Sequence, residues 1–142
     1  YDNDGKVNGT VEDPGMLAIN VPPFNWDIDG DGSAQPLTDG LLVLRKLFGF
    51  SGTTLTSSAI GNSATRDAAI DVEAYIQVGI DNGLLDIDGD GQAKPLTDGL
   101  LLLRYLFGFR GDTLINSAIG TGATRSTAND IEAFIENLVV AI

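Results

Sequence analysis

The sequence predicts a mainly α-helical fold in which one loop-and-helix unit occurs twice, preceded by a short extended N-terminal segment. The chain aligns with itself at a shift of 59 residues, pairing 27–76 with 86–135 without a gap, and 35 of the 50 pairs are identical. Each copy opens with a run rich in Gly and Asp, which favours turns over regular structure. Apolar residues then recur at helical spacing. These observations predict a tandem duplication of a helical unit.

The N-terminal region differs in kind from the repeats. Residues 16–21 could form a short strand or an extended strap, which Pro22 and Pro23 would end because proline supplies no amide donor. We therefore expect an extended segment over 1–23 and a repeat domain over 24–142.

The first helix of each copy follows the Gly- and Asp-rich loop. Its apolar face in copy one consists of Leu41, Leu42, Leu44, Leu47 and Phe48. We expect Thr38 to cap the start of this helix and Gly49 to end it. Thr97 and Gly108 hold the same places in copy two.

Two further helical segments are predicted in each copy. A short helical turn is expected over 54–60 and over 113–119, each closed by the glycine of a shared Ala-Ile-Gly sequence. A longer amphipathic helix comes last in each copy. We expect Asp67 to cap it in copy one and Ser126 in copy two.

Composition limits the chemistry open to this chain. Its net charge of -12, from 20 acidic and 8 basic residues, argues against nucleic acid or an anionic membrane as partner. Histidine and cysteine are absent, which excludes Ser-His-Asp triads, cysteine nucleophiles, zinc fingers and disulfides. The sequence contains no uninterrupted apolar stretch of about 18 residues, so it predicts no membrane span. Oxygen ligands remain, and hard cations such as calcium and magnesium prefer them.

The opening of each copy matches the first half of an EF-hand calcium loop. Asp27, Asp29 and Asp31 occupy positions 1, 3 and 5, and a glycine at position 6 permits the sharp turn around an ion. The counterparts in copy two are Asp86, Asp88 and Asp90. The pattern predicts one cation site in each copy.

The second half of each loop departs from the twelve-residue pattern. Position 12 is a threonine in both copies, and its hydroxyl cannot replace a bidentate carboxylate. We predict loops that are one residue longer, closed by Asp39 in copy one and Asp98 in copy two. Pro36 and Pro95 would mark the place of the extra residue.

A backbone carbonyl at position 7 should complete each site. We expect it from Ser33 and Gln92, with Ala34 and Ala93 as alternatives if the extra residue enters earlier. Four converging carboxylates repel one another by about 1 to 4 kcal/mol per pair, and a divalent ion reverses that repulsion. Magnesium is the ionic alternative, but its small octahedral shell suits a flexible loop less well. We therefore predict two calcium ions.

An incomplete third loop could open the chain. Asp2, Asp4, Asn8 and Glu12 fit its ligand positions in the lengthened register, but position 1 would precede Tyr1 and no leucine-rich helix follows. We favour a flexible polar terminus over a third site.

Basic and aromatic residues that recur in both copies have more than one interpretation. The arginines are Arg45, Arg66, Arg104 and Arg125. We expect them to pair with Asp71, Glu73, Asp130 and Glu132, with a recognition surface as the alternative. The phenylalanines are Phe48, Phe50, Phe107 and Phe109, expected in the core rather than as partner anchors. Trp26 should seal the apolar side of the first loop, with sugar stacking as a weaker alternative.

Duplicated DxDGDG loops, each followed by a leucine-rich helix, make residues 24–136 resemble the dockerin family. The resemblance implies an extracellular or cell-surface location in a secreted bacterial protein, and a cohesin-like or other extracellular protein domain as partner. Dockerin repeats are shorter, so that 51–66 and 110–125 look like insertions. Dockerins often contact partners through the residues before the closing acid, which are Pro-Leu in both copies here.

The sequence thus predicts a calcium-binding, non-enzymatic module for protein docking. The alternative is a structural spacer or terminal cap that calcium stabilises and that has no specific partner. A glycosidase with paired carboxylates is disfavoured because calcium would occupy most of the candidate acids. An intracellular sensor is disfavoured because Met16 is the single methionine and no methionine-rich face exists. The opening Tyr1-Asp2 suggests an excised or processed piece.

Overall fold

A computed structural model describes residues 24–139 of the chain. The predicted strap over 16–21 and the incomplete loop over 2–12 lie outside these residues. Across the described part, the fold contains six α-helices and two π-helical turns and no strand. This confirms the prediction of a mainly α-helical fold.

The helical elements occur in the same order in both repeats. In repeat one they are the π-helical turn η1 (Pro36–Gly40), α1 (Leu41–Leu47), α2 (Gly52–Thr56) and α3 (Ala69–Asp81). In repeat two they are η2 (Pro95–Gly99), α4 (Leu100–Leu106), α5 (Asp112–Ile115) and α6 (Ala128–Glu136). The π-helical turn joins each acidic loop directly to the first helix, so the loop and helix form one continuous unit.

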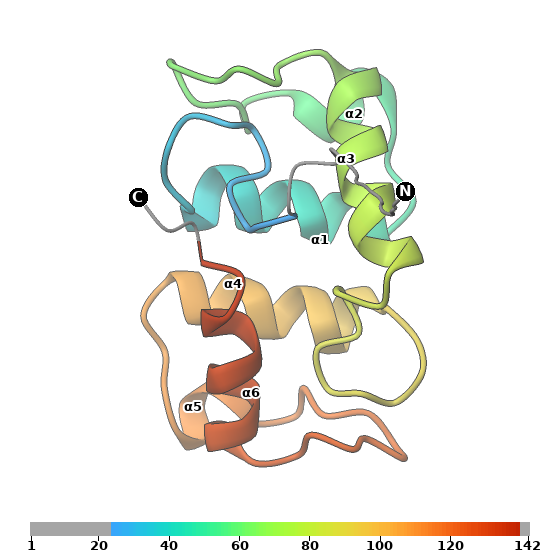
Figure 1. Cartoon of the computed structure of the whole chain (residues 1–142), viewed down its shortest axis with the longest axis vertical. Helices are drawn as coiled ribbons and strands as arrows, with labels where there is room; N and C mark the ends of the chain where they lie inside the picture. Colours follow the sequence, from blue (N-terminus) through green and yellow to red (C-terminus); the bar gives the residue numbers. More distant parts are fainter. Residues whose placement is uncertain (1–23, 140–142) are drawn as a thin grey trace, which may run out of the picture.

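The two repeats are stacked along the long axis of the molecule, with α1 and α4 side by side where they meet (Figure 1). A Cβ atom added to Gly40 would lie 3.0 Å from Leu103 Cδ1, and one added to Gly99 would lie 2.9 Å from Leu44 Cδ1. The start of each helix therefore packs against the middle of the other. This reciprocal contact makes the pair antiparallel and relates the repeats by an approximate two-fold axis.

One apolar core runs through both repeats and anchors both loops. Ile28 and Ile87, which separate the first two aspartates of each loop, are fully buried. Full burial of such a side chain contributes about 1.5 to 3 kcal/mol, so each loop is held against the core from within. Leu42 of α1 and Leu101 of α4 are also fully buried. The loops are thus fixed parts of the domain.

The first helix of each repeat ends in a Schellman motif. Gly49 has a φ of 96°, its N–H donates to the Lys46 carbonyl at 2.9 Å, and the Phe50 N–H donates to the Arg45 carbonyl at 2.9 Å. Gly108 has a φ of 100° in the same motif. The predicted role of both glycines is confirmed.

The predicted caps at the helix starts are wrong. Thr38 and Thr97 lie inside the π-helical turns, and each donates its hydroxyl to the next aspartate instead of capping a helix. In each loop the extra residue produces a π-helical turn, which begins at Pro36 or Pro95. The helical geometry therefore starts before the threonine. The wider turn thus accounts for the error.

The later helices also begin and end at other residues than predicted. The short helices start earlier and stop earlier than 54–60 and 113–119. They stop because Ser57 and Asn116 have ψ values of 123° and 122°, outside the helical region, and Ser58 and Ser117 follow with positive φ. Ala68, not Asp67, precedes α3. In α6 the cap is Thr127, whose Oγ1 accepts from the Asp130 N–H at 3.2 Å.

The repeated phenylalanines do not pack in the core. Phe48, Phe50, Phe107 and Phe109 are 51%, 45%, 51% and 45% exposed. They follow the last helical residue, and the Schellman turn directs the chain outward there. The predicted core role of these residues is wrong.

The first pair of arginines binds backbone carbonyls rather than acids. Arg45 Nη1 donates to the carbonyls of Leu55 and Ser57 at 2.9 and 2.8 Å, and Arg104 makes the equivalent contacts in repeat two. Short helices leave their last carbonyls unpaired, and the guanidinium satisfies them. The predicted ion pairs of Arg45 and Arg104 are therefore wrong.

Candidate metal centre

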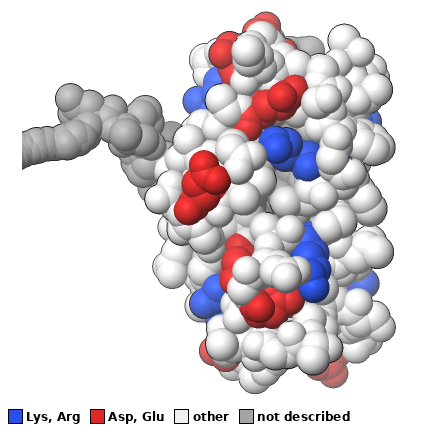
Figure 2. Space-filling model, turned by 90° about the vertical axis from the view of Figure 1, so that its right-hand side faces the viewer, with Lys and Arg blue, Asp and Glu red and all other residues white. Residues whose placement is uncertain are grey.

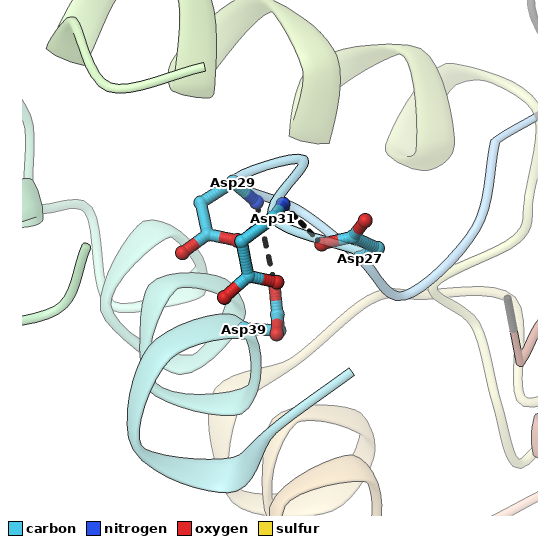
Figure 3. Close-up of side chains that lie close together, drawn as sticks. All are labelled: Asp27, Asp29, Asp31 and Asp39. Carbon is cyan, nitrogen blue, oxygen red and sulfur yellow. Dashed lines mark hydrogen bonds between the residues drawn. The ribbon is translucent and has the colours of Figure 1, made fainter. Parts of the chain in front are cut away.

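Each repeat gathers four aspartates into one small cluster. The clusters are Asp27, Asp29, Asp31 and Asp39 in repeat one, and Asp86, Asp88, Asp90 and Asp98 in repeat two. In each cluster, one carboxylate oxygen from every residue lies within 4.8 Å of the others. Figure 3 shows the first cluster, with the loop aspartates facing Asp39 at the start of the helix. The structure thus brings together eight of the ten predicted site residues.

The first aspartate of each cluster closes the turn of its own loop. Asp27 Oδ1 accepts from the Asp31 N–H at 3.1 Å, and its Oδ2 accepts from the Gly32 N–H at 2.9 Å. Asp86 accepts from Asp90 and Gly91 at the same distances. These bonds bend the loop so that its alternate side chains converge.

The last aspartate ties the start of the helix to the loop. Asp39 Oδ1 accepts from the Ile28 N–H at 2.6 Å, and Oδ2 accepts from the Gln35 N–H at 2.8 Å. Asp98 makes bonds of 2.6 and 2.8 Å with the N–H groups of Ile87 and Lys94. Each oxygen accepts a second, longer hydrogen bond as well: Asp39 Oδ1 accepts from the Asp29 N–H at 3.2 Å, and Oδ2 accepts from the Thr38 hydroxyl at 3.1 Å.

A π-helical turn accommodates the extra loop residue. The Gly40 N–H donates to the Gln35 carbonyl five residues earlier at 3.1 Å, and Gly99 pairs with Lys94 at 3.0 Å. An i→i−5 turn holds one residue more than an α-helical turn. Pro36 begins this turn, where its missing N–H leaves no bond unmade. The turn brings the aspartate after the threonine, and not the threonine itself, into the cluster.

The clusters bury negative charge. Asp29, Asp39 and Asp88 are fully buried and Asp98 is 1% exposed. Burial raises the pKa of Asp39 to about 7 and that of Asp98 to about 6, despite hydrogen bonds that lower both. Burial, assisted by the neighbouring carboxylates, also raises the pKa values of Asp29 and Asp88.

One basic side chain forms a salt bridge with a cluster carboxylate. Lys94 Nζ lies 4.0 Å from Asp90 Oδ2, which is the only salt bridge between residues 24 and 139. Figure 2 shows acidic side chains gathered in both halves of one face, with a few basic ones beside them. A buried carboxylate without a counterion is costly, so the arrangement fits a bound cation.

The remaining two predicted site residues lie at the rim of the clusters. The Ser33 N–H donates to Asp31 Oδ1 at 3.1 Å, and the Gln92 N–H donates to Asp90 Oδ1 at 3.0 Å. Ser33 is half-buried and Gln92 is exposed. Both residues contact the clusters through N–H groups. That their carbonyls, or those of Ala34 and Ala93, complete the metal sites stays a prediction.

Residues from the 51–66 segment contact the first loop, and the sequence interpretation missed them. The Gly61 N–H donates to Asp29 Oδ2 at 2.7 Å, and the Gly120 N–H donates to Asp88 Oδ2 at 2.7 Å. Both glycines belong to the Ala-Ile-Gly sequence that is identical in the two copies. Because the Ala-Ile-Gly sequence is identical in both copies although it lies outside any helix, it was the signal that could have identified these two glycines.

The second pair of arginines also binds the loops. Arg66 Nε and Nη2 donate to the carbonyls of Ile28 and Asp27, both at 2.9 Å, and its guanidinium lies 3.7 Å from the centre of the Tyr75 ring. Arg125 makes the same bonds in repeat two and lies over Phe134. The predicted pairing of these arginines with acidic residues is wrong, because the loop carbonyls and the aromatic faces hold them.

Trp26 lies beneath the first loop. It is fully buried, its indole N–H donates to the Ile135 carbonyl at 2.8 Å, and its ring packs edge-on against Phe24. The side chain therefore joins the start of loop one to α6 in the other repeat. A fully buried ring offers no face for sugar stacking.

Comparison of the chain with protein-family models, with curated proteins and with solved structures finds no match. The dockerin resemblance therefore stays a prediction that rests on the loop motifs. None of the helices between residues 24 and 139 combines the length and the apolar character that crossing a membrane requires.

Proposed function

We propose that this chain is a calcium-binding, non-catalytic docking module of a secreted or cell-surface protein, with one ion in each repeat. The observation that carries the proposal is the pair of four-aspartate clusters, which are largely buried and in which only Asp90 forms a salt bridge within residues 24–139. Repetition of the same geometry in both repeats supports a common purpose for the clusters.

The residues that would hold the first ion come from the loop and from the turn before α1. Asp27, Asp29 and Asp31 supply oxygens from the loop, and Asp39 supplies one from the π-helical turn. The Ser33 carbonyl or a water would complete the shell. A bound divalent ion neutralises the carboxylates, which removes their mutual repulsion and favours the folded loop.

The donor type favours calcium over magnesium. Calcium accepts about six to eight oxygens in a flexible geometry, whereas magnesium requires a small octahedral shell with bonds of about 2.0 to 2.1 Å. Each cluster offers four carboxylates from a loop and the adjoining turn. A ligand set of four carboxylates also leaves few places for the waters that magnesium retains.

Calorimetric titration tests this proposal. Protein that has been freed of metal with a chelator and then desalted should bind two calcium ions per chain, and magnesium should bind far more weakly. Asp39→Asn and Asp98→Asn should each remove one ion. A wild-type chain that releases no heat with calcium and gains no thermal stability from it would refute the proposal.

The docking role is supported by apolar side chains exposed in equivalent places of both repeats. Leu37 and Leu96, directly before the threonine of each π-helical turn, are 61% and 62% exposed. Binding to purified cohesin domains, with calcium and then with chelator, tests this role. Intact calcium sites without any such binding would favour the alternative of a structural spacer or cap.

A further inference from the structure

Three residues of the connection between α1 and α3 lie against the outside of the first acidic loop. We call Gly61, Thr65 and Arg66 the collar; the collar of the second loop is Gly120, Thr124 and Arg125. The side-chain contacts are the same in both repeats, and one backbone contact differs, because the Thr124 N–H donates to the Gly89 carbonyl at 3.2 Å whereas the Thr65 N–H donates to the Asp29 carbonyl at 2.9 Å.

The collar binds four consecutive carbonyl groups of the loop. Arg66 holds the first two with its guanidinium, as described above. The N–H groups of Thr65 and Arg66 donate to the Asp29 carbonyl at 2.9 and 2.8 Å. Thr65 Oγ1 donates to the Gly30 carbonyl at 2.9 Å. The backbone that carries the first two ligands is therefore fixed from outside, with its carbonyl groups already bonded.

The collar also contacts the carboxylates themselves. The Gly61 N–H donates to Asp29 Oδ2 at 2.7 Å. A Cβ added at Gly61 would lie 3.1 Å from Asp29 Oδ2 and would overlap Asp31 Oδ2. A side chain at this position would push one of the two carboxylates away from the cluster. Glycine therefore allows the collar to close directly over two of the four ligands.

We propose that the collar is an ion-retention device, which holds Asp29 and Asp31 around the ion and slows its release. This inference rests on the proposed function, since it assigns a role in holding the ion that the clusters bind. Release requires these two carboxylates to swing outward. The Gly61 contact and the fixed loop carbonyls oppose that movement. The four aspartates make binding possible, and the collar sets how long the ion stays.

Terbium is a suitable probe because it occupies oxygen sites of calcium size and is excited through a nearby indole. Trp26 directly precedes Asp27, whereas Leu85 precedes Asp86. An Asp98→Asn background, which lacks the closing aspartate of the second cluster, confines the signal to the first site. The full chain would be loaded with terbium and mixed rapidly with excess chelator. Decay of the luminescence gives the release rate of that site.

Gly61→Ala should speed terbium release about tenfold or more, because its Cβ overlaps Asp31 Oδ2 and displaces a carboxylate from the cluster, although the backbone N–H is kept. Thr65→Val should speed release about threefold, because it keeps the volume but loses the bond to the Gly30 carbonyl. Asn62→Ala changes an exposed neighbour and should leave the rate as in the wild type. Circular dichroism of the metal-free variants verifies their fold.

Unchanged release from both folded variants, Gly61→Ala and Thr65→Val, would overturn the collar proposal while leaving calcium binding intact. If Gly61→Ala does not fold, Thr65→Val alone decides: faster release supports the proposal and an unchanged rate overturns it. Failure of the wild-type chain to bind terbium or calcium would instead overturn the proposed function. The two failures are therefore distinguishable.

Discussion

In repeat one the first aspartate of the cluster, Asp27, is 7% exposed, whereas its counterpart Asp86 is half-buried. Gln35 in repeat one is replaced in repeat two by Lys94, whose ammonium lies 4.0 Å from Asp90. Burial raises the pKa of Asp39 to about 7 and that of Asp98 to about 6. The second site thus has a salt bridge that the first lacks. We therefore expect the first site to gain more from a bound cation.

The bonds inside the two clusters, by contrast, are nearly the same. The contacts from Ile28 to Asp39 and from Ile87 to Asp98 are both 2.6 Å, and those from the collar glycines are both 2.7 Å. Some of the differences between the repeats lie beside the clusters, as at Gln35 and its counterpart Lys94 and at Trp26 and its counterpart Leu85. The comparison teaches that the ligand framework is common and that the surroundings set the difference between the sites.

Removal of a closing aspartate should have the largest effect. A unit charge about 2.4 Å from a divalent ion is worth about 3 kcal/mol even at the dielectric constant of water, so Asp39→Asn should weaken the first site by about 100-fold or more. Asp98→Asn should do the same to the second site. Calcium calorimetry of each variant should show one site lost and the other retained.

Thr38→Ala is the control for that experiment, because Thr38 donates to Asp39 but adds no carboxylate. It should keep two ions per chain. Loss of a site in Thr38→Ala together with retention in Asp39→Asn would show that position 12, and not the aspartate after it, closes the loop.

The pH dependence of stability should have opposite signs without and with calcium. The pKa of Asp39 is raised from 3.8 to about 7 by burial, so the folded metal-free chain holds protons that the unfolded chain releases. Metal-free stability should therefore fall as the pH rises from about 4 to about 7, by about 4 kcal/mol from Asp39 alone. Calcium-saturated protein should instead lose stability as the pH falls, because protons displace the ion.

Thermal unfolding across this pH range measures both slopes. Asp39→Asn should flatten the metal-free slope more than Asp98→Asn does, because the pKa of Asp98 rises only to about 6. Equal slopes in the two variants would remove the proposed electrostatic difference between the sites.

Replacement of Trp26 by leucine, the residue at the equivalent position of repeat two, should have an intermediate effect on stability. Trp26→Leu leaves a cavity in the core and removes the bond from the indole to the Ile135 carbonyl, so unfolding should become easier by about 3 kcal/mol. Urea unfolding with calcium present measures this loss. Leu85→Ala is the matched truncation in repeat two, with an expected cost of about 2 to 4 kcal/mol. A cost below about 1 kcal/mol for Trp26→Leu would mean that the bond between repeats adds little.

Exchange of the residues at the rim should have the smallest effect. Lys94→Gln removes a cation beside the second cluster and should raise its calcium affinity by no more than about fivefold, since exposed ion pairs contribute under about 1 kcal/mol. Gln35→Lys should lower the affinity of the first site to a similar extent. Calorimetry at low ionic strength detects both changes. Shifts in the opposite directions would contradict the electrostatic comparison.

The sequence predicted the duplicated helical unit and the two groups of aspartates because these depend on local patterns. Periodic leucines, the glycine of a Schellman motif and the spacing of the acids can all be read within one segment. Closure of the loop by Asp39 instead of Thr38 was predicted from the same spacing. The π-helical turn that brings Asp39 into the cluster was not predicted, because no residue pattern distinguishes it from an irregular loop end.

Contacts between distant segments escaped prediction. Arg66 reaches carbonyl groups 38 and 39 residues earlier in the chain, and Gly61 reaches a carboxylate 32 residues earlier. Acidic partners were expected for the arginine because charge is visible in a sequence, whereas an unpaired carbonyl is not. The exposure of Phe48 and Phe50 depends on where the chain turns after α1, which hydrophobicity alone does not specify.

Anomalous diffraction from crystals grown with calcium or terbium tests the central claim most directly. The account predicts one strong peak in each repeat, placed among the four carboxylates, with an oxygen of Asp39 or Asp98 in its coordination shell. Two clusters with no peak, or with the carboxylates turned apart toward solvent in the presence of abundant ion, would contradict it.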